Sequence, residues 1–138
     1  MESQIKYIEL KTDGVRGVGR IGLLDSSKTG KTLYYNEKVL APLKGWAAKA
    51  NYYDEETGEE YWVSNPKKDG KDSLFPAIIE IDENARDEYW LRLRNLPQNV
   101  TQSSYSSPGR SKKEREKVEN SVRRHDIDRR YRAPKSVT

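Results

Sequence analysis

The chain of 138 residues contains no cysteine, one histidine and one phenylalanine. Without cysteine it can form neither a disulfide nor a thiolate metal site, and it has no thiol nucleophile. The single histidine, His125, cannot by itself build a zinc site or a serine–histidine nucleophile pair. We therefore expect a protein that is not an enzyme and that uses no metal ion and no cofactor.

Apolar residues are also scarce, because only 33% of the chain is hydrophobic. No apolar run approaches the roughly 18 residues that a membrane span requires. Residues 1–6 lack the apolar region of a secretory signal peptide. Together with the absence of cysteine, these features predict a cytoplasmic protein of bacterial type that has no membrane partner.

The composition changes near Pro97. Residues 1–97 carry 15 Lys and Arg against 17 Asp and Glu, together with all three tryptophans and seven of the nine tyrosines. Residues 98–138 carry 11 basic residues against 5 acidic ones, a net charge of +6. We predict a domain over 1–97, a flexible linker over 98–110 and a basic tail over 111–138 that is partly helical or disordered.

The pattern within residues 1–97 is that of short strands separated by glycine-containing turns. Ala85, Tyr89 and Leu93 then recur at helical spacing, which predicts a helix over about 83–95. The expected fold is α+β, a small antiparallel barrel or strongly bent sheet of five to six strands with one packed helix, SH3-like or OB-like in architecture. The expected strands cover residues 3–11, 17–25, 32–35, 48–53, 60–64 and 75–81, and residues 39–41 are a candidate for a short further strand.

Two segments are similar to phosphate-binding loops. Residues 17–22 spell G-x-G-x-x-G, but the segment that follows leaves no room for the helix that a dinucleotide site needs. Residues 25–32 end in Gly-Lys-Thr, but Asp25 occupies the position of the first P-loop glycine. We interpret the first segment as a strand whose glycines permit bending and the second as a lysine-rich hairpin turn.

Four motifs carry a family resemblance: Gly-Arg-Ile-Gly at 19–22, residues 27–35, residues 51–64, and Lys-Lys-Asp-Gly at 67–70. With them the chain resembles a family of short bacterial proteins that are uncharacterised. The resemblance spans roughly residues 17–95, and Tyr-Trp-Val-Ser at 61–64 is its most distinctive part. It implies no catalytic residue.

Aromatic residues on the predicted strands alternate with Lys and Arg, and the tail adds further positive charge. Such surfaces stack on unpaired bases and neutralise phosphates. We therefore predict a binding module associated with RNA or single-stranded DNA. The candidate contact residues are Arg20, Lys28, Lys31, Lys44, Lys49, Tyr53, Trp62, Arg110, Lys112, Lys113, Arg123, Arg124, Arg129 and Arg130.

A protein partner is the alternative. The acidic hairpin 54–60 lacks the ligand spacing of a calcium loop and would instead offer a charged contact surface. The tail could supply a helix with Val118, Val122 and Ile127 on its apolar face. In this interpretation the protein is an adaptor or a small inhibitor. The sequence leaves both the identity of the partner and the oligomeric state open.

Overall fold

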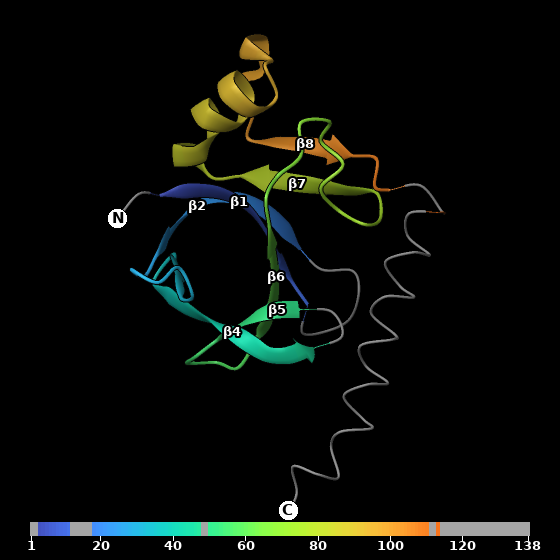
Figure 1. The fold of residues 1–138 in the computed structure, drawn as a ribbon. Helices are drawn as coiled ribbons and strands as arrows, with labels where there is room; N and C mark the ends of the chain where they lie inside the picture. The colour runs from blue at the N-terminus through green and yellow to red at the C-terminus, as the bar shows by residue number, and fades with distance from the viewer. Residues whose placement is uncertain (1–2, 12–17, 48–49, 111–112, 114–138) are drawn as a thin grey trace, which may run out of the picture.

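The computed structural model describes residues 3–11, 18–47, 50–110 and Lys113 (Figure 1). Within these ranges, no helix is both long enough and apolar enough to cross a membrane. The strands are β1 (Gln4–Leu10), β2 (Gly19–Ser26), β3 (Leu33–Tyr35), β4 (Lys38–Ala47), β5 (Ala50–Asp54), β6 (Glu60–Ser64), β7 (Ala77–Ile81) and β8 (Ser104–Ser107). The helical turns are η1 (Glu83–Ala85), η2 (Glu88–Leu93) and η3 (Pro97–Asn99).

The first six strands form a closed antiparallel barrel, seen as a ring in Figure 1. Each strand pairs with the next one along the chain, and β6 returns to pair with β1. Closure removes the free edges that an open sheet would expose. The predicted small barrel with one packed helix is confirmed, and its strands are connected up and down.

The strand β2 extends this barrel into a second layer. Its last residues, Asp25 and Ser26, pair with β3 inside the barrel wall. On the same edge, Arg20 and Ile21 pair in parallel with β7, which in turn pairs with β8. The sheet therefore splits at β2, and β7 and β8 continue it beyond the barrel.

Two hydrophobic cores follow from this arrangement, because successive residues of a strand point to opposite faces. On β1, Ile8 faces the interior of the barrel and Tyr7 faces the outer layer. The interior core consists of Ile8, Leu24, Leu33, Leu40 and Val63. The outer core, between the barrel wall and the helical segment, consists of Tyr7, Ile21, Ile79, Ile81, Ala85, Tyr89, Trp90 and Tyr105.

The predicted helix over 83–95 is present, but most of it has π geometry. It begins with the 3-10 turn η1 and continues into η2, where the Arg94 amide donates to the Tyr89 carbonyl at 2.9 Å. This five-residue closure brings residue i+5 over residue i, which an α-helix does not. As a result the Arg94 guanidinium lies 5.6 Å from the centre of the Tyr89 ring.

The prediction of a flexible linker over 98–110 is wrong. This segment contains β8, whose Tyr105 is 9% exposed and stacks on Tyr89 with ring centroids 5.1 Å apart. The Trp90 indole also donates to the Gln102 carbonyl at 3.1 Å. The serine-rich composition did not predict a strand, because β8 is stabilised by one buried tyrosine and by pairing with β7 rather than by a run of apolar residues. Of the predicted tail over 111–138, only Lys113 lies within the described residues.

We predict that removal of residues 98–138 unfolds the protein, whereas removal of residues 114–138 does not. The first truncation deletes β8 and the Tyr105 side chain, and the loss of one large core aromatic alone costs about 3–5 kcal/mol. That loss is comparable with the total stability of a small domain, roughly 5–15 kcal/mol. Urea unfolding followed by tryptophan fluorescence measures both truncations, and a cooperative transition for residues 1–97 at the full-length midpoint would contradict the prediction.

Candidate functional site

Gly19 and Gly22 allow close packing within the strand that the sequence indicated. A Cβ atom at Gly22 would lie 2.6 Å from the Tyr35 ring and 2.7 Å from Asp82 Oδ2. A Cβ atom at Gly19 would lie 2.5 Å from the Tyr7 hydroxyl oxygen. Both glycines lie within β2, and the residues after it turn into β3. The interpretation as a strand rather than a dinucleotide loop is confirmed.

Arg20 is held in an ion pair where the sheet splits. Its Nε and NH2 atoms donate to Asp82 Oδ1 at 3.0 and 2.6 Å, and the Tyr35 hydroxyl donates to Asp82 Oδ2 at 2.5 Å. The hydrogen bond with Asp82 raises the pKa of Arg20. Burial, reinforced by Asp82, raises the pKa of Tyr35 to about 12. Asp82 therefore neutralises the charge of Arg20 within the fold, so Arg20 is not presented as an unpaired cation for a phosphate group.

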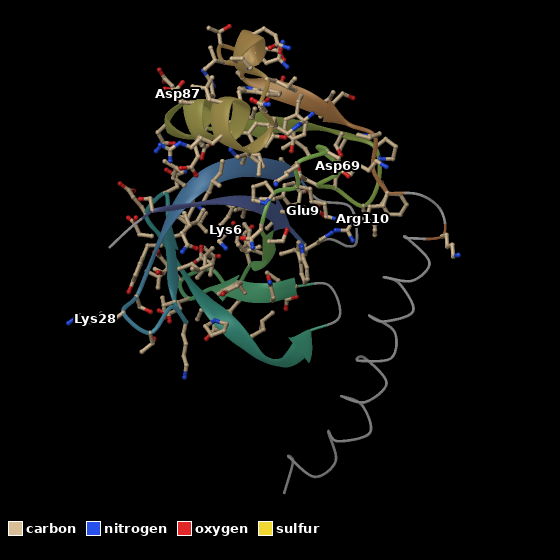
Figure 2. All side chains as sticks on the ribbon, turned by 45° about the horizontal axis from the view of Figure 1, so that its top comes forward. Lys6, Glu9, Lys28, Asp69, Asp87 and Arg110 are labelled. Atoms are coloured by element: carbon tan, nitrogen blue, oxygen red, sulfur yellow. The ribbon has the colours of Figure 1, made fainter. Side chains whose placement is uncertain are left out.

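Residues 27–32 form the turn between β2 and β3 that the sequence indicated, and Asp25 and Ser26 still belong to β2. The Ser27 amide donates to the Thr32 carbonyl at 2.9 Å, and Gly30 adopts a φ of +77°. Lys28 and Lys31 are exposed on this turn. In Figure 2, Lys28 projects on the opposite side of the molecule from Asp69 and Arg110.

The described aromatic side chains of the barrel are mostly half-buried. Trp62 packs against the outer core, and Tyr53 is half-buried on the outside of the barrel. Tyr52 and Tyr61, their chain neighbours, pack against the interior core instead. Among the aromatic side chains that the structure describes, only Tyr34 is more than about a third exposed, at 38%. The barrel side chains that the structure describes therefore include no row of exposed rings.

The structure instead gathers lysines beside the C-terminal end of β8. We define the basic patch as Lys67, Lys68, Lys71, Arg110 and Lys113. Lys67, Lys68 and Lys113 are exposed, and Lys71 and Arg110 are half-buried. Lys113 follows Arg110 by three residues and so lies within about 10 Å of it. Asp69, in the same turn as the first three lysines, is an exposed acid within this group.

Hydrogen bonds and close backbone packing join the two chain segments of the basic patch. The Arg110 amide donates to the Leu74 carbonyl at 3.0 Å, and the Ser73 and Ser107 hydroxyl groups are 3.0 Å apart. A Cβ atom at Gly109 would lie 2.7 Å from the Phe75 carbonyl carbon. The loop between β6 and β7 is thus fixed against the residues that follow β8.

The Asp72 side chain connects this loop to Tyr105 on β8. Its carboxylate accepts hydrogen bonds from the Lys67 amide at 2.6 Å and from the Tyr105 hydroxyl at 2.5 Å. Burial raises the pKa of Asp72, and both hydrogen bonds and the charge of Arg94 oppose the rise. The Arg94 guanidinium is enclosed by the rings of Tyr89, Trp90 and Tyr105 at 5.5–5.6 Å and donates to the Tyr89 hydroxyl at 2.7 Å.

A second buried carboxylate lies on β1. Glu9, only 4% exposed, accepts a hydrogen bond from the Tyr7 hydroxyl and forms an ion pair with Lys11. Burial and the charge of Glu9 raise the pKa of Tyr7. Glu9 and Asp72 are therefore both bound within the fold, and neither is presented as an open acid.

Half of the predicted contact residues fall outside the described part of the chain or have no described side chain. These are Lys44, Lys49, Lys112, Arg123, Arg124, Arg129 and Arg130. Sequence reasoning in turn did not group Lys67, Lys68 and Lys71 with Arg110 and Lys113. Their Lys-Lys-Asp-Gly-Lys run was visible as a turn, but its contact with residues 107–110 required the tertiary fold.

No family model, curated protein or solved structure matches the chain. Within the described residues, no group of three or more His, Asp or Glu side chains could hold a metal ion. The site is therefore interpreted from its own geometry, as an exposed cationic surface on a fixed loop.

We predict that the pKa of Asp72 is higher in the folded than in the unfolded protein. The native state then binds this proton more readily, so the contribution of Asp72 to stability increases as pH falls from the folded pKa to the unfolded pKa. Arg94→Gln should raise the folded pKa further, because it removes a nearby positive charge. Carboxyl carbon NMR measures the titration, and Lys68→Gln is the control. A lower Asp72 pKa in Arg94→Gln would contradict this account.

Proposed function

We propose that this protein is a non-enzymatic module that binds nucleic acid through the basic patch and the basic segment that follows it. The observation that supports the proposal is that the loop carrying Lys67, Lys68 and Lys71 is fixed against the residues that follow β8. Residues 114–138 carry eight Lys and Arg against five Asp and Glu, so the patch is continuous along the chain with further positive charge. A surface of this kind is suited to phosphate groups.

The attraction is local rather than a property of the whole domain. The described residues contain fifteen Lys and Arg and fifteen Asp and Glu, so their formal charges cancel. The basic patch holds five of these cations, with Asp69 as an exposed acid in its turn. Acidic residues collect elsewhere, with Glu80, Glu83 and Asp87 exposed on β7 and the helical segment. A polyanion is thus directed to one part of the surface.

Affinity should therefore depend on the loop lysines. We predict that Lys67→Glu with Lys68→Glu weakens binding to an oligonucleotide and reduces its dependence on salt. The logarithm of the association constant falls with the logarithm of the salt concentration, and removing one phosphate contact makes this slope shallower by about 0.7–0.9. Fluorescence anisotropy with the full chain at several salt concentrations measures both quantities.

The matched control is Lys28→Glu with Lys31→Glu, which reverses two exposed lysines on the turn between β2 and β3. It alters the net charge equally, but on the opposite side of the molecule (Figure 2). An equal loss of affinity in both double variants would assign binding to net charge rather than to the basic patch. Absence of binding at low salt would reject the proposed function.

The acidic hairpin between β5 and β6 supports a second candidate, contact with a basic protein surface. Asp54 Oδ1 accepts hydrogen bonds from the backbone amides of Glu56 and Thr57 at 2.8 and 3.4 Å, which lowers the pKa of Asp54. Gly58 completes the turn with a φ of +79°. Glu55 and Glu56 are exposed on this fixed turn. The predicted C-terminal helix, the other element of this candidate, lies outside the described residues.

A protein partner of the hairpin should no longer bind Glu55→Lys with Glu56→Lys. Affinity capture from nuclease-treated extract of the native cell, read by mass spectrometry, compares this variant with the unmodified chain. Glu83→Lys with Asp87→Lys is the control, because it reverses two exposed acids on the helical segment. A partner retained by the first variant would exclude the hairpin as its contact.

A further inference from the structure

We infer that the basic patch recognises the phosphate backbone of a duplex, without reading bases and without stacking on a single strand. This inference rests on the proposed function and specifies its ligand. It departs from the stacking platform that the sequence suggested, because the rings of Tyr89, Trp90 and Tyr105 beneath the lysine-bearing loop are buried.

Three rings beneath the lysine-bearing loop are enclosed, and Phe75, within that loop, is half-buried. Tyr105 and the Asp72 carboxylate, which anchors the loop, are 9% and 6% exposed. Tyr89 and Trp90 are at most 1% exposed, and the Arg94 guanidinium covers all three rings. A Cβ atom at Gly70 would lie 2.5 Å from Arg94 NH1, so the loop itself packs onto that guanidinium. A base therefore cannot stack on these rings without opening the outer core.

The exposed Tyr34 lies in a different place. It is on β3, three residues after Lys31, and it pairs across the sheet with Asp25 and Val39. The turn that contains Lys28 and Lys31 is on the opposite side of the molecule from Arg110 (Figure 2). Tyr34 therefore cannot stack a base whose phosphate is bound at the basic patch. Single-strand binders combine both contacts on adjacent nucleotides.

The side-chain chemistry of the basic patch also favours phosphate. Its exposed cations are Lys67, Lys68 and Lys113. A lysine ammonium is a compact, strongly hydrated point charge that lacks the planar fork of an arginine guanidinium. Contacts to phosphate position a protein on a duplex and carry no sequence information.

A duplex is the preferred polyanion because its charge is denser. Duplex DNA carries one charge per about 1.7 Å of axis, and each neutralised phosphate contributes about 0.9 to the salt slope, against about 0.7 for a single strand. Without stacking, a single strand has no further contact to offset this difference. We therefore expect tighter and more salt-dependent binding to the duplex.

The experiment uses the full chain with a labelled duplex, each of its separated strands and a duplex of unrelated sequence, all of equal length. Anisotropy titrations at several salt concentrations should show the duplex bound several-fold more tightly than either strand, and the two duplexes bound equally. Lys67→Gln with Lys68→Gln should lower the duplex slope by about 1.8, the value for two contacts. Tyr34→Ala should leave every affinity unchanged.

The opposite outcomes are distinguishable. Tighter binding of single strands, weakened by Tyr34→Ala, would overturn the duplex inference and place a stacking site at β3 while keeping nucleic-acid binding. A preference for one duplex sequence would also overturn it. Failure of every probe to bind at the lowest salt would reject the proposed function itself. Folding of each variant is checked by its urea transition.

Discussion

The pairing of β7 with the first half of β2 is the constraint on which the rest of this structure depends. A six-stranded barrel closed between β1 and β6 is complete without it. Because Arg20 and Ile21 pair in parallel with β7, the sheet extends beyond the barrel and has a second apolar face. The helical segment covers that face, and β8 lies at its border.

Polar groups fix the junctions between these layers. Asp82 joins the start of the helical segment to Arg20 and Tyr35 on the barrel, and Asp72 joins the loop after β6 to Tyr105 on β8. In each case a tyrosine hydroxyl donates to a carboxylate, which satisfies a partly buried charge. The position of the basic patch depends on the second junction, because Lys67, Lys68 and Lys71 belong to the loop that Asp72 connects to β8.

Local patterns were enough to predict much of the fold. Alternating residues and glycine turns indicated the barrel strands, and the spacing of Ala85, Tyr89 and Leu93 indicated the helical segment. The strand β8 was missed because Ser-Tyr-Ser-Ser has the composition of a linker and gains its apolar contacts only through Tyr105. The π geometry was missed because its register with Arg94 depends on ring contacts rather than on local propensity.

The sequence by itself determined the short strands, the turns, the lack of thiol chemistry and the basic character of residues 98–138. Only the tertiary structure decided that Trp62 packs against the outer core, that Arg20 is paired with Asp82, and that the loop carrying Lys67 and Lys68 is fixed against the residues after β8. The physical reason is that strand periodicity specifies alternation between two faces but not which face is buried. That choice depends on contacts between residues far apart in the chain.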